Sequence, residues 1–121
     1  MNSNILLITI DALRHDFVNQ ELTPFLYSIA KEGCFFENHF SGGPYTWASF
    51  PSLFSSTYPH MLGYGHMLNR ASFVDVLREV GYATLGFPNS ELLSPNWGYS
   101  KGFDYYEFDG GLQQSLAPSH V

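Results

Sequence analysis

The carboxylate of Asp11 stands where an α/β protein would bind a ligand. Asp11 directly follows the apolar run from Ile5 to Ile10, and ligands of open α/β sheets bind outside the carboxyl ends of the strands. Asp11 is therefore a candidate functional group, although it could also serve only to cap the turn after the strand. Arg14 and Asp16 follow closely, and this pair is more typical of an exposed ion pair than of a site.

Histidine and cysteine side chains could also do chemistry. The histidines His15, His39, His60 and His66 invite a metal-binding interpretation, but their spacings match no zinc signature. We interpret them as ordinary surface or hydrogen-bonded histidines. Cys34 lies in an apolar segment and is predicted to be a buried, unreactive thiol.

Alternating apolar patterns predict the elements that must position these groups. Strands are predicted at 4–10, 34–40 and 82–87, with a short last strand at 103–108. Three helices are predicted. The first runs from Thr23-Pro24 to Gly33, the second ends at Tyr58-Pro59, and the third runs from Ser72 to Gly81. Pro51 would strain the second helix if it began at Thr46, so a start near Ser49 is expected. The fold class is α/β, a mostly parallel central sheet flanked by helices.

Composition excludes several classes of protein. The chain has 121 residues, of which 45% are hydrophobic and 13% charged, which is too apolar for intrinsic disorder. The net charge of −6 repels phosphate backbones, so no nucleic-acid partner is expected. The run from Ile5 to Ile10 is too short to span a bilayer, so no membrane partner is expected. A single cysteine, Cys34, allows no internal disulfide and fits a reducing, cytoplasmic location.

Aromatic residues make up 17% of the chain. Most of them lie on periodic apolar faces, which indicates packing in a core rather than a binding surface. Trp97, Tyr99, Tyr105 and Tyr106 lie outside clear helical stripes and are candidates for a contact surface.

Four segments in a fixed order carry a resemblance to a known family. They are residues 4–16 (NILLITIDALRHD), 23–38, 46–59 (TWASFPSLFSSTYP) and 98–104 (GYSKGFD). The third is similar to the sulfatase nucleophile segment C-x-P-S-R-A-S-L-x-T-G-x-Y-P, and the fourth to a later G-L-D-R-G-F-D stretch. The chain thus resembles the amino-terminal part of the sulfatase and alkaline-phosphatase-like superfamily. Residues 1–109 are assigned to this partial fold, and 110–121 to a flexible tail or truncated linker.

The resemblance implies a hydrolase of sulfate or phosphate esters that acts on a small anionic ester. It implies that Asp11 is a metal ligand. It also implies that Thr46 is both the nucleophile and another ligand of the same metal. A cation neutralises the non-bridging oxygens of such an ester and activates the attacking hydroxyl. The divalent cation could be Zn, Mn, Mg or Ca, and one carboxylate does not choose among them.

Departures from the family pattern narrow this expectation. Sulfatases convert a Cys or Ser to formylglycine, and Thr46 cannot be converted in this way. The relatives that use a threonine nucleophile are phosphodiesterases, nucleotide pyrophosphatases and phosphatases, so phosphate esters are favoured. Ala48 replaces the family proline, Phe50 replaces its arginine, and Ala12 replaces the second Asp of its Asp-Asp pair.

The family's remaining metal ligands, including a downstream Asp-His or Asp-Asn pair, have no counterpart after Asp109. The chain is therefore expected to be incomplete as an enzyme, with a missing carboxyl-terminal half or a site completed elsewhere. The alternative is a catalytically inactive module that acts in oligomerisation or binding, for example as a homo-oligomer that covers an exposed apolar face.

Overall fold

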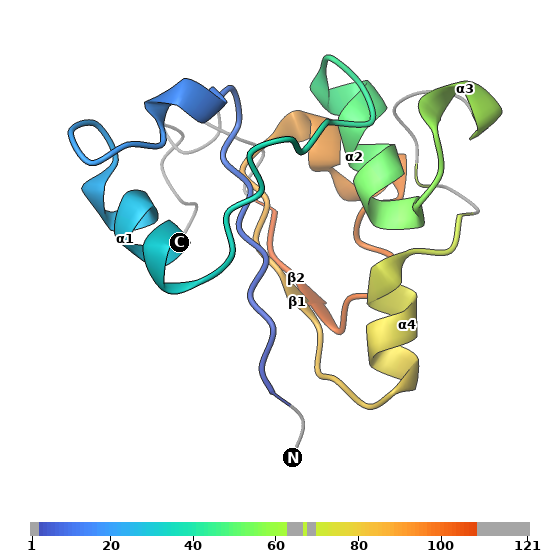
Figure 1. The fold of residues 1–121 in the computed structure, drawn as a ribbon. Helices are drawn as coiled ribbons and strands as arrows, with labels where there is room; N and C mark the ends of the chain where they lie inside the picture. The colour runs from blue at the N-terminus through green and yellow to red at the C-terminus, as the bar shows by residue number, and fades with distance from the viewer. Residues whose placement is uncertain (1–2, 63–66, 68–69, 109–121) are drawn as a thin grey trace, which may run out of the picture. The chain divides into compact units, whose positions relative to one another are not determined.

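The computed structural model describes residues 3–62, 67 and 70–108, and the chain divides into two compact units. Unit 1 is Met1–His39 and unit 2 is Phe40–Val121. The predicted α/β class is confirmed: helices accompany a small parallel sheet, in which β1 (Leu85–Gly86) pairs with β2 (Tyr105–Tyr106) (Figure 1). The predicted tail at 110–121 and His66 lie outside the described residues.

The described part of unit 1 contains one 3-10 turn, η1 (His15–Phe17), and one helix, α1 (Pro24–Glu32). Helix α1 begins where the sequence predicts, because proline is tolerated in the first turn. Thr23 does not cap it, however: its hydroxyl donates to the carbonyl of Phe17 at 2.8 Å instead. Gly33 ends the helix, with its amide donating to the carbonyl of Ile29 at 3.0 Å.

The two strands predicted at 4–10 and 34–40 are wrong. The structure assigns no strand to either segment. The first segment is exposed, with Leu6 82% and Ile8 66% accessible. A strand that is apolar on both faces forms only where neighbouring strands and covering helices bury it, and no residue described in unit 1 is buried. Cys34 is exposed, so the predicted buried thiol is also wrong.

Unit 2 begins with three helices. They are α2 (Thr46–Ser55), α3 (Pro59–Leu62) and α4 (Phe73–Glu79), and α2 contacts both of the others. Helix α2 starts at Thr46 rather than near Ser49, which corrects the sequence-based start. The carbonyl of Tyr45 accepts hydrogen bonds from the amides of Ala48 (3.0 Å) and Ser49 (2.9 Å), which closes the first turn.

Pro51 therefore lies inside α2, where it lacks the amide that would continue the helical hydrogen bonds. Its ring is buried in the core of unit 2. Burial of the ring offsets the missing hydrogen bond, which is a contribution that the local sequence pattern does not reveal.

Aromatic side chains contribute to the core of unit 2 around Tyr99, but other described aromatic residues, among them Phe25, Tyr45 and Phe87, are exposed, so the expectation that most aromatic residues pack in a core is not confirmed. The ring of Tyr99 is 2% exposed and lies edge-on to Phe50 and Phe54, with centroids 6.4 and 5.7 Å away. Phe54 in turn contacts Phe73 of α4 at 5.1 Å. Tyr99 is thus a core residue, whereas Tyr105 is 50% exposed.

Hydrogen bonds link Asp104, the last residue of the segment 98–104, to Thr84, which directly precedes β1. Asp104 accepts hydrogen bonds from the amide and hydroxyl of Thr84 (3.0 and 3.1 Å), and its amide donates to the Thr84 carbonyl at 2.9 Å. Arg78 of α4 bonds the same carboxylate at 2.9 Å. The hydrogen bonds from Thr84, first of all the backbone one, lower the pKa of Asp104 below its ordinary value. Strands β1 and β2 lie within the predicted segments but are shorter.

A capping box starts α4, as the sequence predicts. The Ser72 hydroxyl accepts from the Asp75 amide at 3.3 Å, and the Asp75 carboxylate accepts from the Ser72 amide at 2.8 Å. Lys101 donates to the Arg70 carbonyl at 2.8 Å and lies 3.8 Å from Asp75. Two short 3-10 turns, η2 (Glu91–Leu93) and η3 (Pro95–Trp97), precede this segment.

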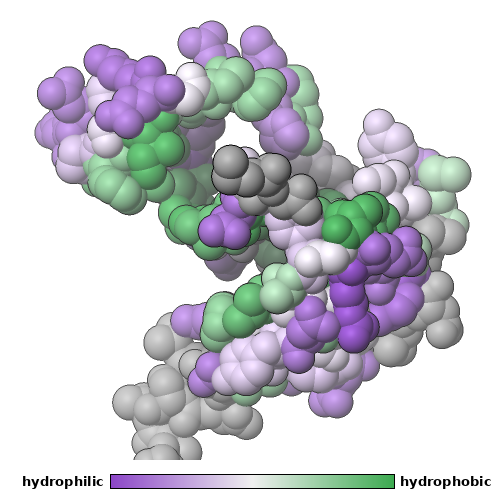
Figure 2. All heavy atoms as spheres, turned by 90° about the horizontal axis from the view of Figure 1, so that it is seen from below, coloured by the Kyte–Doolittle hydropathy of each residue, from purple (hydrophilic) through white to green (hydrophobic). Residues whose placement is uncertain are grey.

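Apolar side chains also reach the surface in patches between hydrophilic ones (Figure 2). Within the described residues, no helix has the length and apolar character needed to cross a bilayer.

Candidate functional site

Asp11 lies in a tight turn of unit 1. The turn runs from Ile10 to Leu13, and the Leu13 amide donates to the Ile10 carbonyl at 3.5 Å. Ala12, inside the turn, has a φ of 56°. This left-handed conformation favours glycine, asparagine or aspartate over alanine. The Asp11 carboxylate is exposed and makes no hydrogen bond or ion pair with any described residue, so it does not cap its own turn.

The neighbouring charges are paired with each other. The Arg14 guanidinium donates to both carboxylate oxygens of Asp16 at 2.9 and 2.8 Å, and both side chains are exposed. The hydrogen bond from Arg14 lowers the pKa of Asp16. His15 stacks on Phe35 with ring centroids 5.3 Å apart. The interpretation of Arg14 and Asp16 as a surface ion pair is confirmed.

Thr46 is the first residue of α2 and is half-buried. The first amides of a helix lack a partner within it and favour an anion. The hydroxyl of Thr46 has no hydrogen-bond partner among the described residues. Gly42 and Gly43 lie directly on this helix: a Cβ on Gly42 would come 2.5 Å from that of Ser52, and one on Gly43 would overlap Ala48.

A metal centre is not complete within the described residues. Asp11 belongs to unit 1 and Thr46 belongs to unit 2, so each residue is described within its own unit. Carboxylate and hydroxyl oxygens are the donor type that hard divalent cations prefer. The described part of the chain holds no group of three or more His, Cys, Asp or Glu side chains that could bind a metal. Thus the donor type fits a divalent cation, but the number of donors does not.

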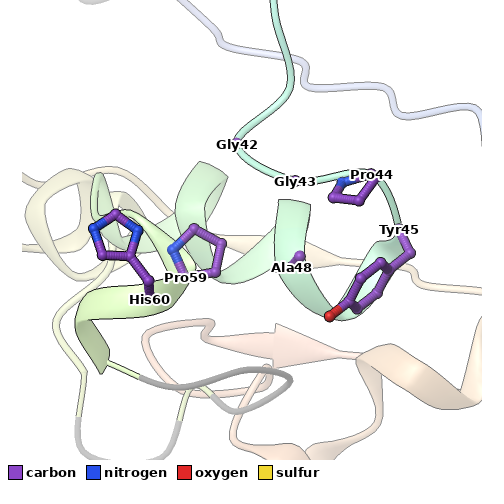
Figure 3. Close-up of a pocket in the computed structure, with 7 residues that line it drawn as sticks. All are labelled: Gly42, Gly43, Pro44, Tyr45, Ala48, Pro59 and His60. Carbon is purple, nitrogen blue, oxygen red and sulfur yellow. The ribbon is translucent and has the colours of Figure 1, made fainter.

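A pocket of about 230 Å³ opens beside the first turn of α2 (Figure 3). We call it the α2 pocket. Thr46 is not among the residues that line it. The lining comes from the loop before α2, from α2 itself and from the start of α3: Gly42, Gly43, Pro44, Tyr45, Ala48, Pro59 and His60.

Comparison with known families gives one result. The sulfatase family matches residues 3–118 of the chain, which is more than half of its length. The chain belongs to the sulfatase family. No curated protein and no solved structure matches it.

Sulfatase-family membership confirms the resemblance that the four segments carry and assigns the chain to a family of ester hydrolases that generally use a divalent metal. The segment 46–59, whose sequence resembles the sulfatase nucleophile segment, begins at the first residue of α2, Thr46. Sequence reasoning missed the α2 pocket. The pair Gly42-Gly43 was a signal for this pocket, because the loop can approach α2 closely only without side chains at these positions. Nothing in the sequence near His60 indicates that its side chain lines the pocket.

Proposed function

We propose that this sulfatase-family chain takes part in the metal-dependent hydrolysis of sulfate or phosphate esters, with Thr46 as the nucleophile. The observation that carries the proposal is the position of Thr46. Thr46 is half-buried, its hydroxyl has no partner among the described residues, and it starts a helix in which the amides of Thr46 and Trp47 have no carbonyl partner among the described residues, whereas that of Ala48 donates to Tyr45; free amides at a helix start favour an anion. These amides would hold the non-bridging oxygens of the ester while the hydroxyl oxygen bonds to phosphorus or sulfur, the ester bond breaks and the alcohol leaves with the proton that the hydroxyl gives up; water would then hydrolyse the ester formed on Thr46 and release the acid.

Phosphate esters are favoured over sulfate esters in this proposal. Thr46 keeps its hydroxyl because it cannot become formylglycine, and hydroxyl nucleophiles are typical of phosphodiesterase and phosphatase relatives.

Asp11 is proposed as a ligand of the divalent cation, which is Zn, Mn, Mg or Ca. The support is its exposed carboxylate, which no described residue engages. The remaining ligands would come from outside the described residues. A cytoplasmic location is proposed as well, because the exposed free thiol of Cys34 suits a reducing compartment.

Turnover of aryl phosphate, phosphodiester and sulfate substrates with added Mn²⁺ or Zn²⁺ tests the nucleophile. Thr46→Ala should lower turnover by about a thousandfold or more, whereas Thr46→Ser should keep part of it. Ser49→Ala is the matched control, because it removes a hydroxyl from the same helix. Equal activity of wild type and Thr46→Ala would remove Thr46 from the mechanism.

Calorimetric titration with Mn²⁺ or Zn²⁺ tests the metal ligand separately. Asp11→Asn should abolish specific binding. Asp16→Asn should leave it unchanged, since that carboxylate is already paired with Arg14. Identical titrations of wild type and Asp11→Asn would exclude Asp11 as a ligand.

A catalytically inactive, self-associating module is the second candidate. It is favoured by the exposed apolar side chains of unit 1, among them Leu6, Ile8 and Phe25, which are 82%, 66% and 74% exposed. Burial of such residues against a second copy would be favourable. Sedimentation of the full chain tests this: association that Leu6→Ser weakens would support the module, and a monomer at all concentrations would exclude it.

A further inference from the structure

The α2 pocket is built by two segments that lie 14 or more residues apart in the sequence. The loop from Gly42 to Tyr45 forms one side, and Pro59 and His60 at the start of α3 form the other, with Ala48 between them (Figure 3). Ala48 and Pro59 are buried, whereas Tyr45 is 53% exposed. The pocket therefore has a fixed base and an open mouth.

The lining is mostly apolar. The side chains of Pro44, Ala48 and Pro59 are hydrocarbon, and the side-chain polar atoms come from Tyr45 and His60 alone, beside polar backbone groups of the lining. A pocket with this character suits a compact apolar group with one or two polar atoms, because a polyhydroxylated ligand would leave hydroxyls without partners. A cavity of about 150 Å³ lined by apolar side chains binds benzene, so about 230 Å³ accommodates a six-membered ring with a substituent.

The anionic part of a substrate has no counter-charge in this pocket. No Lys or Arg lines it, and neither does Thr46. Tyr45 precedes Thr46 and Ala48 follows it by two residues, so the pocket borders the first turn of α2, to which Thr46 belongs. A substrate held at that turn by its anion would extend its other end into the pocket.

We propose that the α2 pocket binds a compact apolar ring and takes the alcohol part of the ester substrate, with Tyr45 and His60 as specificity-determining residues. This inference rests on the proposed function for the identity of the ligand. His60 is suited to the role because its ring stacks on Tyr58, with centroids 5.7 Å apart and an interplanar angle of 19°, which restrains its orientation. An imidazole held in this way can hydrogen-bond an oxygen on the ring.

Binding of phenol to the full chain, followed by NMR, tests the pocket without requiring turnover. Phenol should shift the ring resonances of Tyr45 and His60 saturably, and glucose should not. Tyr45→Ala and His60→Ala should each weaken phenol binding several-fold. Met61→Ala is the matched control, since Met61 is 65% exposed on the same short helix and does not line the pocket. Equal affinities of His60→Ala, Tyr45→Ala and Met61→Ala would overturn the proposal.

Turnover then separates this inference from the proposed function. Tyr45→Ala should lower kcat/KM for phenyl phosphate several-fold more than it lowers kcat/KM for methyl phosphate. An equal loss for both esters would overturn the specificity role while the hydrolase proposal stands. If no ester is hydrolysed, the proposed function fails, and phenol binding alone decides whether the pocket binds a ring.

Discussion

At the scale of single residues, two glycines share a backbone conformation that a side chain disfavours but differ in the atoms that surround them. Gly81 and Gly102 have φ values of 93° and 86°, which are unfavourable for any residue with a Cβ. A Cβ at Gly81 would meet no atom within 4 Å, whereas one at Gly102 would come 2.9 Å from the carboxylate and 3.1 Å from the amide of Asp75. Only Gly102 therefore lies against another element, at the capping box of α4.

Gly81→Ala should lower the free energy of unfolding by about 1 kcal/mol through backbone strain alone. Gly102→Ala should cost at least about 1 kcal/mol more, because the Asp75 amide cannot move without opening the capping box. Urea denaturation of both variants measures the difference. Equal losses would show that the close approach of Gly102 to α4 does not contribute.

Tyr99 has a buried hydroxyl with no hydrogen-bond partner among the described residues. An unpartnered buried hydroxyl carries a desolvation cost, so Tyr99→Phe should leave stability at pH 7 unchanged or raise it by about 1 kcal/mol. Thermal unfolding at pH 7 measures this. Tyr106→Phe is the control and should destabilise, because the Tyr106 hydroxyl donates to the Leu93 carbonyl. A strong loss in Tyr99→Phe would mean that its hydroxyl has a partner.

Burial also raises the pKa of Tyr99 to about 12, against an ordinary value of 10.0. Between these pH values the unfolded chain releases the phenol proton and the folded chain keeps it. Stability is therefore fully present below pH 10 and falls as the pH rises toward 12. Tyr99→Phe should make this fall shallower without removing it, because burial raises the pKa of Tyr106 as well. Denaturation curves from pH 8 to 12 measure the slopes, and identical slopes would contradict the assignment.

At the scale of the elements, local signals account for where α1 and α4 begin. Proline in the first turn places α1, and the reciprocal bonds of Ser72 and Asp75 place α4. Both signals act over three or four residues, so they can be read from the sequence. The start of α2 cannot be read in this way, because Pro51 is accommodated by burial in the core of unit 2.

Ser72→Ala should therefore destabilise unit 2 by about 1 kcal/mol, as loss of an N-cap does. Ser28→Ala is the matched control, since the Ser28 hydroxyl only donates back to the Phe25 carbonyl within α1. Circular dichroism during urea denaturation follows both variants. A neutral Ser72→Ala would show that the capping box does not stabilise α4.

At the scale of the whole molecule, the two units differ in how much they bury. The described part of unit 1 contains no buried residue, whereas unit 2 has an aromatic core around Tyr99 and polar ties between Thr84 and Asp104. Hydrogen exchange should therefore be fast for the amides of residues 4–10 and slow for those of Thr84 and Asp104. Strong protection across 4–10 would instead mean that the predicted strand forms and is paired.

The sequence by itself determined the α/β class, the family, the ends of the locally encoded helices and the candidate residues Asp11 and Thr46. These rest on short-range patterns and on motif order, which need no knowledge of distant contacts. Only the tertiary structure decided that Tyr99 is buried and Cys34 exposed, that α2 begins at Thr46, that the run from Ile5 to Ile10 is unpaired, and that His60 lines a pocket. Each of these depends on which distant residues cover a side chain or pair with a strand, and periodicity along the chain carries no information about that partner.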